Sequence, residues 1–230
     1  MTLDPGTRSR LTDTLGVEID PELLSLALTH RSYSYEHGQI PHNERLEFLG
    51  DSVLGQAVTV MLYTRHPDLD EGTLAKRRAS LVSTVALAEV ARGIGLGEHL
   101  LLGRGEELTG GRDKDSLLAD TTEALIGATY LSAGPDAATA LVLRLIQPLL
   151  ADPDRFGAAM DPKTSLQELA DALGRPAPAY SVVAAGPDHD RVFTATVAVG
   201  DVSATGTGTS KKHAEMAAAL HAWHELSGRA

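Results

Sequence analysis

The sequence has 230 residues, of which 43% are hydrophobic, and a formal net charge of −11. This length fits one large domain or two smaller ones, and the absence of cysteine excludes disulfides and thiolate metal sites. The sequence has neither the apolar run of about 18 residues that spans a membrane nor an apolar signal-peptide core, so we expect a cytoplasmic protein without membrane contact.

The negative charge is spread along the chain. Residues 1–155 contain 14 Lys+Arg and 23 Asp+Glu, whereas residues 156–230 contain 6 and 8. Because neither part is basic, any binding of nucleic acid must use local patches and should depend strongly on salt.

The first two-thirds of the sequence predicts helices. Apolar residues recur there at helical spacing, and no alternating strand pattern is present. The predicted helices are 21–30 with Asp20 as N-cap, 43–65, 73–92, 116–133 with Ser116 as N-cap, and 136–150. These residues, 1–150, therefore predict an all-α domain. Residues 151–162 lack a helical period and contain two prolines, which is typical of a linker.

Residues 163–230 have a different pattern. Thr164 and Gln167 fit a capping box at the start of a helix that should end at Gly174. Strands rich in β-branched residues follow, and then a final helix. The predicted strands are 180–183, 192–199 and 202–205, with turns at 186–190 and 200–201, and the final helix is 210–226. The order α-β-β-β-α predicts a small α+β domain.

Two predicted helices each carry a pair of carboxylates on one face. Glu47 and Asp51 are four residues apart, and Asp120 and Glu123 are three apart, in otherwise apolar runs. Four carboxylates drawn together repel unless a hard cation joins them, and Mg²⁺ is the natural candidate. The spacing alone leaves open the alternative of solvated helix faces paired with cations. Gly50 and Gly127 each cost about 1 kcal/mol in a helix, which is tolerable if these helices approach closely.

A second candidate site lies near the C-terminus. Residues 206–210 form a glycine-containing loop before a helix that starts with Lys211 and Lys212. Cations are unfavourable at the positive end of a helix dipole, and a bound phosphate would reverse that penalty. The alternative is a pair of solvated surface lysines.

Several segments resemble those of a known family. Residues 43–52 (NERLEFLGDS) closely resemble the motif of the ribonuclease III family, and residues 27–33 (ALTHRSY) and 118–127 (LADTTEALIG) are also similar to it. Residues 161–168 (DPKTSLQE) and the helix with the two lysines resemble a double-stranded RNA-binding domain. The resemblance covers nearly the whole chain.

The resemblance implies a homodimer of all-α catalytic domains, each with one Mg²⁺-dependent site in which Mn²⁺ could substitute. Such enzymes cut both strands of double-stranded RNA and leave 5′-phosphate and 3′-hydroxyl ends with a short 3′ overhang. Ribosomal RNA precursors and some messenger RNAs are the targets that the resemblance implies.

The resemblance also assigns roles to single residues. Glu47, Asp51, Asp120 and Glu123 match the metal-site acids, and we assign Asp51 and Glu123 to the catalytic centre. Glu44 matches an acid near the RNA. Phe48 matches an aromatic residue that inserts into the partner subunit, although its apolar surroundings alone would place it in the core.

Double-stranded RNA-binding domains similar to residues 163–230 contact successive minor grooves of the duplex. The resemblance assigns these contacts to Gln167, Glu168 and His189. Lys211 and Lys212 would contact the phosphates between these grooves. Such contacts recognise A-form shape more than sequence.

Some alternatives remain open at this stage. The chain could be a binding protein that regulates double-stranded RNA without cutting it, although all four acids are intact, or a DNA nuclease. The cations Lys76, Arg77, Arg78, Arg112 and Lys114 could contact phosphates or form structural ion pairs. The nine histidines lack the paired spacing of a zinc site.

Overall fold

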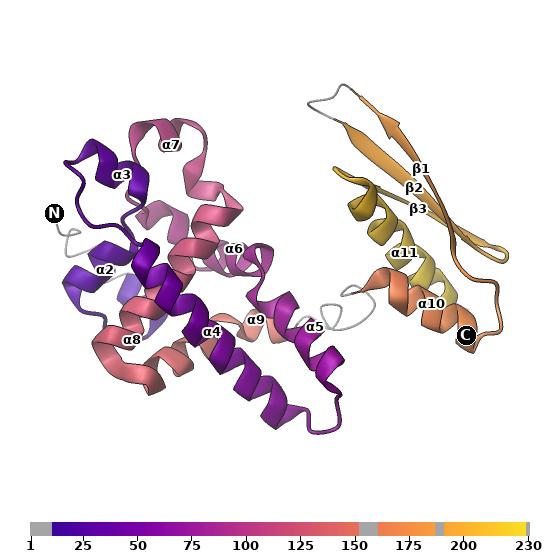
Figure 1. The fold of residues 1–230 in the computed structure, drawn as a ribbon, viewed down its shortest axis with the longest axis horizontal. Helices are drawn as coiled ribbons and strands as arrows, with labels where there is room; N and C mark the ends of the chain where they lie inside the picture. Colours follow the sequence, from indigo (N-terminus) through magenta and orange to yellow (C-terminus); the bar gives the residue numbers. More distant parts are fainter. Residues whose placement is uncertain (1–10, 152–160, 187–190, 229–230) are drawn as a thin grey trace. The chain divides into compact units, whose positions relative to one another are not determined.

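The computed structural model of the chain describes residues 11–151, 161–186 and 191–228. They belong to two compact units, Met1–Ala151 and Asp152–Ala230 (Figure 1). Each unit has its own core and is described by itself. Residues 152–160 of the predicted linker, 151–162, lie outside the described ranges, as do residues 187–190 of the predicted turn at 186–190.

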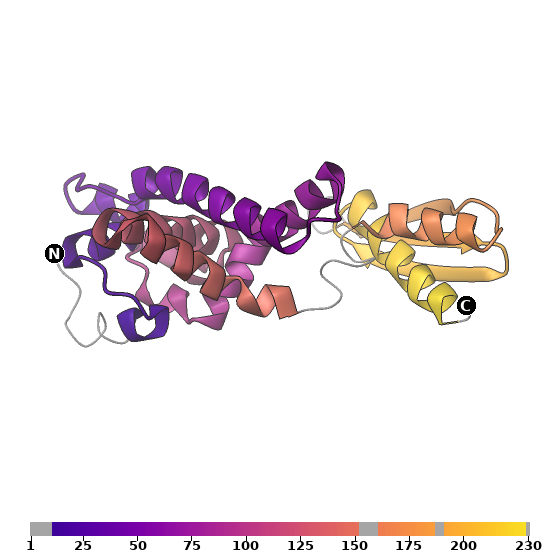
Figure 2. The same cartoon turned by 90° about the horizontal axis from the view of Figure 1, so that it is seen from below.

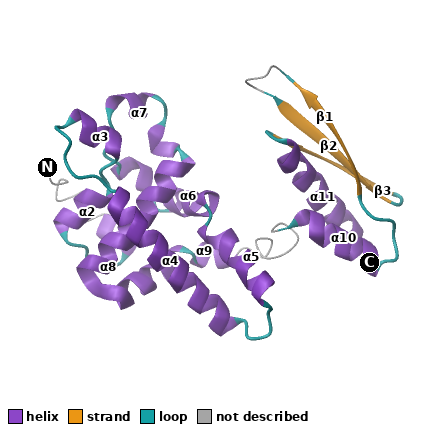
Figure 3. Cartoon of the chain, in the orientation of Figure 1, coloured by secondary structure: helices purple, strands orange, loops and turns teal. Residues whose placement is uncertain are grey.

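The first unit is helical (Figure 3), which confirms the prediction of an all-α domain fold. Residues 11–15 are helical, and the elements that follow are α2 (Pro21–Ala27), α3 (Arg31–Glu36), α4 (Glu44–Arg65), α5 (Glu71–Val82), α6 (Thr84–Gly93), η1 (Leu96–His99), α7 (Arg104–Leu108), η2 (Gly111–Asp113), α8 (Asp115–Leu145) and α9 (Gln147–Ala151). No helix in the described ranges is both long enough and apolar enough to cross a membrane.

Helices α4 and α8 form the centre of this unit. They make its most extensive helix–helix contact and lie side by side in both views (Figures 1 and 2). The buried residues of α4 include Leu46, Val53, Ala57 and Met61, which recur at helical spacing as predicted. Helices α2 and α6 pack on α8, so the two acid-bearing helices are held at the core of the unit.

The helix predicted over residues 73–92 is wrong in one respect, because Ser83 divides it into α5 and α6. Ser83 has an extended backbone, with φ of −69° and ψ of 153°, and its Oγ accepts a hydrogen bond from the Ala86 N–H at 3.3 Å. Serine is a preferred N-cap, so this residue begins a second helix where the apolar periodicity alone continues the first.

The cap predicted at Ser116 is also wrong. Helix α8 begins at Asp115, and Lys114 occupies the cap position, where its side chain makes no capping hydrogen bond to the first turn. The predicted end of this helix is correct, because the backbone is non-helical at Gly134, whose φ is 87°. This left-handed conformation is one that glycine adopts readily.

The second unit contains α10 (Pro162–Ala172), β1 (Ala179–Ala185), β2 (Val192–Val199), β3 (Val202–Gly208) and α11 (Lys211–Ser227). The strands form an antiparallel sheet in the order β1-β2-β3, which confirms the predicted α-β-β-β-α fold. Helix α11 contacts all three strands and packs against α10. Their shared core includes Leu166, Val197, Ala218 and Leu226, each fully buried.

The predicted capping box of α10 is wrong. Asp161, not Thr164, is the N-cap, and its carboxylate accepts a hydrogen bond from the Thr164 N–H at 3.3 Å. Pro162 then occupies the first helical position, where its missing N–H has no cost. The helix therefore begins three residues before the predicted one.

Candidate active site

The crossing of α4 and α8 depends on two glycines. A Cβ atom on Gly50 would lie 1.7 Å from the backbone oxygen of Glu123, and one on Gly127 would lie 2.3 Å from that of Leu46. Each helix thus presents a bare backbone to the other, as the sequence predicted. By contrast, a Cβ on Gly55, one turn further along α4, would meet no atom within 4 Å.

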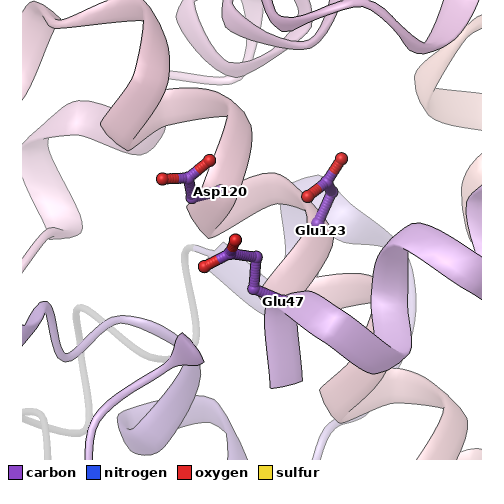
Figure 4. Close-up of side chains that lie close together, drawn as sticks. All are labelled: Glu47, Asp120 and Glu123. Carbon is purple, nitrogen blue, oxygen red and sulfur yellow. The ribbon is translucent and has the colours of Figure 1, made fainter. Parts of the chain in front are cut away.

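This close crossing brings carboxylates from the two helices together. Glu47 of α4 lies opposite Asp120 and Glu123 of α8 (Figure 4), and one oxygen from each of the three lies within 4.8 Å of the others. All three side chains are partly buried. Oxygen atoms in this arrangement could hold a hard divalent cation, which takes carboxylate ligands.

Asp51, the fourth predicted acid, lies outside this group. It is exposed on α4, one turn after Glu47. Its charge still acts on the site, because it is the largest contribution after burial to the raised pKa of Glu123. The structure therefore brings three of the four acids together and places the fourth within electrostatic range.

The electrostatics of the site are those of crowded, partly desolvated acids. Burial, with added repulsion from Asp51, Asp120 and Glu47, raises the pKa of Glu123 to about 8. Burial also raises the pKa of Glu47, with further repulsion from Asp120. The pKa of Asp120 is raised by burial as well, against the opposing charge of Arg31. A bound cation would relieve all of these repulsions at once.

The other predicted residues of the first unit lie around this cluster. Glu44 is the first residue of α4, half-exposed, with its Oε1 3.6 Å from the Arg31 Nη1. The Phe48 side chain is 79% exposed. That exposure contradicts a core position for Phe48 and leaves a large aromatic side chain facing solvent.

The basic residues that the sequence left ambiguous have local partners. The Arg112 Nη1 donates to the backbone oxygens of Gly97 and Leu100 at 3.0 Å each, and Lys114 forms an ion pair with Glu106. These two cations therefore stabilise the loops around α7. In the cluster 76–78, the Arg78 Nη1 donates to the Thr59 Oγ1 at 3.3 Å.

In the second unit, the two lysines are exposed at the start of α11, and Ser210 caps this helix by accepting the His213 N–H at 3.2 Å. Gln167 is partly buried on α10, with its Nε2 2.9 Å from an oxygen of Asp171, and Glu168 is exposed. His189 lies outside the described residues.

Comparison with known proteins identifies both units. A family model described as Ribonuclease-III-like matches residues 20–149, and one described as Double-stranded RNA binding motif matches residues 162–226. The chain belongs to the ribonuclease III family.

Relatives in the ribonuclease III family match both in sequence and in structure. "Ribonuclease 3" of Leifsonia xyli subsp. xyli is 73% identical over 221 residues, which cover 96% of this chain and 93% of that protein. The crystal structure of the ribonuclease III nuclease domain from Campylobacter jejuni is 40% identical, with a TM-score of 0.59, over 64% of this chain and 97% of that one. A second structure of that domain concerns flexibility in a region involved in dimer formation. It is 41% identical, with a TM-score of 0.58, over 60% of this chain and 95% of that one.

Enzymes of the ribonuclease III family depend on metal ions. Among the described residues, the carboxylates of Glu47, Asp120 and Glu123 form the group that could hold such an ion. Sequence reasoning alone did not find the residues beside them. His30 and Arg31 line a cavity that reaches Glu47 and Asp120. The resemblance of residues 27–33 to the ribonuclease III family was the available signal, although it assigned no role to any residue there.

The raised pKa of Glu123 predicts how the metal-free protein responds to pH. Between its ordinary value of 4.5 and about 8, the folded protein retains a proton that the unfolded chain has released. The free energy of unfolding therefore falls as the pH rises through this window. Glu123→Gln should remove most of this fall and stabilise the metal-free protein at about pH 9 by about 1–2 kcal/mol, a figure discounted for the partial exposure of the group.

Thermal unfolding in EDTA across this pH range measures the effect. The advantage of Glu123→Gln should shrink toward about pH 5, where both states of the wild-type protein hold more protons, and should also shrink when Mg²⁺ is added. A difference in melting temperature between the two proteins that stays the same at every pH would contradict the raised pKa of Glu123.

Proposed function

We propose that this chain is a Mg²⁺-dependent endoribonuclease that, as a homodimer, cleaves both strands of double-stranded RNA. The observation that carries the proposal is the gathering of Glu47, Asp120 and Glu123 where two helices of a ribonuclease III unit cross. The proposed products have 5′-phosphate and 3′-hydroxyl ends with short 3′ overhangs. Mn²⁺ should substitute for Mg²⁺, because it also accepts carboxylate ligands in octahedral sites.

The site residues have distinct proposed roles. Glu47, Asp51, Asp120 and Glu123 would hold the metal. Bound Mg²⁺ activates water and stabilises the charge on the phosphate and on the leaving 3′-oxygen. Asp51 and Glu123 form the proposed catalytic centre and orient the attacking water. The exposure of Asp51 supports this assignment, because the side chain is accessible to solvent and to substrate.

The second unit is proposed to hold the duplex by its shape. Gln167 and Glu168, together with His189, would contact minor grooves, and Lys211 and Lys212 would contact the intervening phosphates. The exposure of both lysines at the capped start of α11 supports this role. Glu168 must meet a ribose hydroxyl or a base amino group, since a phosphate would repel it.

Replacing both lysines by alanine should weaken binding of duplex RNA. Each lost phosphate contact should reduce the slope of log affinity against log salt by about 1, and affinity near 0.1 M salt should fall roughly tenfold or more. Arg175→Gln is the matched control, because Arg175 forms an ion pair with Asp201 just before β3, whereas Lys211 and Lys212 follow the other end of that strand. Fluorescence anisotropy over a salt series gives both quantities, and an unchanged slope in the double variant would contradict the proposed contacts.

Phe48 is proposed to lie in the dimer interface. Burying one such side chain contributes about 1.5–3 kcal/mol, and two-fold symmetry buries it twice. Phe48→Ala should therefore weaken dimerisation by on the order of 100-fold or more, with little change in the melting of the subunit. Leu108→Ala removes an equally exposed side chain on α7 and should leave the dimer intact. Sedimentation equilibrium measures both, and equal dissociation constants for the two variants would contradict the assignment.

Further proposals concern organisation and context. We place the catalytic domain at 1–150, a linker at 151–162 and the RNA-binding domain at 163–230. The proposed location is the cytoplasm, and the proposed targets are ribosomal RNA precursors and some messenger RNAs. Membership of the ribonuclease III family and the two matched units support these proposals.

The competing proposal is a protein that binds double-stranded RNA without cutting it. Incubating the full chain in Mg²⁺ with matched RNA and DNA duplexes separates these functions. We expect cleavage of the RNA duplex alone, because B-form DNA lacks the 2′-hydroxyls and the groove geometry that the second unit would recognise. Binding without cleavage would favour the regulator, and equal cutting of both duplexes would refute the substrate assignment.

A further inference from the structure

A polar cavity of about 500 Å³ adjoins the acid cluster. Its walls include His30 and Arg31 at the start of α3, Glu44 at the start of α4, and the site acids Glu47 and Asp120. The cavity therefore shares two acids with the proposed metal site, which makes it a candidate position for a nucleotide next to a phosphate bound there. No role in the proposed reaction has been given to His30.

The ring of His30 is fixed by its neighbours. Its Nδ1 accepts the Ser32 N–H at 3.2 Å and lies 2.8 Å from the Ser32 Oγ. That hydroxyl oxygen also accepts the Gly103 N–H at 2.8 Å, so its own hydrogen is directed at the Nδ1. Because the Nδ1 is an acceptor in both contacts, the neutral ring carries its hydrogen on the Nε2. Burial lowers the pKa of His30, which favours this neutral form.

The backbone around His30 is equally constrained. The His30 N–H donates to the Leu101 oxygen at 3.1 Å, and the Thr29 oxygen accepts the Asn43 N–H at 2.9 Å. These bonds tie the segment to the start of α4 and to the loop before α7. His30, which lines the cavity, is thereby held by backbone hydrogen bonds as well as by those of its ring.

Capping of α3 does not by itself account for a histidine at this position. The cap needs only the acceptor at the Nδ1, and Asn, Asp or Ser supplies such an acceptor more commonly. What histidine adds is the Nε2–H donor. Within the described ranges this atom has no hydrogen-bond partner, and the residue lines a cavity shared with the metal-site acids Glu47 and Asp120.

Glu44 supplies a hydrogen-bond acceptor to the same cavity. Its carboxylate lies 3.6 Å from the Arg31 Nη1 and 3.9 Å from the His42 Nδ1. A phosphate only accepts hydrogen bonds and would be repelled by this carboxylate. A hydroxyl both donates and accepts, so it matches the donor of His30 and the acceptor of Glu44, two of the residues that line this cavity. The 2′-hydroxyl is the group on the RNA backbone with this property.

We infer that this cavity binds the 2′-hydroxyl of a nucleotide next to the cleaved phosphate, with the His30 Nε2–H donating to the hydroxyl oxygen and Glu44 accepting its hydrogen. The inference rests on the proposed cleavage of duplex RNA and adds a specificity-determining residue to it. The catalytic unit would then distinguish RNA from DNA by itself, independently of the RNA-binding unit.

The test combines two variants of the full chain with substrates that lack single hydroxyls. RNA duplexes carry one 2′-deoxynucleotide at each position near the cleaved bond, and single-turnover cleavage in Mg²⁺ is compared with the all-ribose duplex. For the wild-type protein, one position on each strand should slow cleavage by about 3- to 10-fold, the loss of one hydrogen bond. His30→Asn keeps the cap acceptor, but its shorter side chain places no donor at the position of the Nε2, so it should cut the substituted and all-ribose duplexes at equal rates.

His30→Gln is the complementary variant. Its amide places a donor near the position of the Nε2 and gives up the cap acceptor. The slowing of cleavage by the 2′-deoxynucleotide, here called the deoxy penalty, should therefore persist. A role in capping alone predicts the reverse: His30→Gln would be impaired on every substrate, and His30→Asn would behave like wild type. If His30→Asn fails to fold, as thermal unfolding would reveal, His30→Gln decides alone, and loss of the penalty in that folded variant overturns the inference.

The outcomes separate this inference from the proposed function. If the wild-type protein does not cut the all-ribose duplex, the proposed function fails and the inference fails with it. If it cuts that duplex but no deoxy position slows it, or His30→Asn keeps the full penalty, the inference alone is overturned.

Discussion

Glu123→Gln is expected to reduce cleavage of duplex RNA by about 10³-fold or more while leaving binding of the duplex intact. A charged ligand of a catalytic metal contributes several kcal/mol of transition-state stabilisation, and about 1.4 kcal/mol corresponds to tenfold in rate. The amide has the same size as the carboxylate but lacks the charge that would hold the cation. Single-turnover cleavage in Mg²⁺ and anisotropy in Ca²⁺ measure the two properties.

Glu22→Gln is the matched control for this variant, because Glu22 is an exposed acid in the first turn of α2. It should cut at the wild-type rate. Wild-type cleavage by Glu123→Gln would refute the role of Glu123, whereas loss of both binding and cleavage would indicate a folding defect. The expected stabilisation of this variant in EDTA distinguishes the latter case.

Gly50→Ala is expected to destabilise the first unit by about 3 kcal/mol or more, the upper range for overpacking a core. The added Cβ would lie 1.7 Å from the backbone oxygen of Glu123, so α4 and α8 must separate. Because the same crossing places Glu47 beside Asp120 and Glu123, cleavage should fall even at temperatures where the variant stays folded. Calorimetry and cleavage assays at low temperature measure these effects.

Gly55→Ala tests whether close approach, and not helix propensity, explains the effect. Gly55 lies on the same helix with nothing within 4 Å of an added Cβ. In that variant the substitution should raise stability by up to about 1 kcal/mol, as expected for alanine in a helix interior. Similar effects of the two substitutions would contradict the glycine-mediated crossing.

Much of the fold could be predicted from the sequence because local patterns determine it. The apolar spacing in residues 46–61 predicts the buried face of α4, and β-branched runs predict the strands of the second unit. The helix ends were less accurate. Ser83 and Asp161 begin helices because their side chains accept backbone hydrogen bonds, whereas Ser116 fits the same pattern and does not cap α8.

The candidate site was predictable for a different reason. Pairs of carboxylates and two glycines within apolar helices made a close, metal-binding crossing the consistent interpretation, and the structure brings Glu47, Asp120 and Glu123 together there. The position of Asp51 outside this group depends on side-chain orientation, which spacing does not determine.

Long-range contacts were the part that the sequence could not predict. The orientation of the His30 ring depends on a hydrogen bond from Gly103 to Ser32, between residues 71 positions apart. Apolar surroundings likewise suggested a core position for Phe48, which tertiary packing leaves 79% exposed. Both features depend on which surfaces the folded helices present to one another.

Cleavage of an end-labelled, perfectly paired RNA duplex by the full chain, in Mg²⁺ and then in Ca²⁺, tests the central claim most directly. The proposed metal site and paired dimer predict cutting of both strands in Mg²⁺, with 5′-phosphates and short 3′ overhangs, and binding without cutting in Ca²⁺. Binding of the duplex without any cutting in Mg²⁺ would contradict the proposed endoribonuclease.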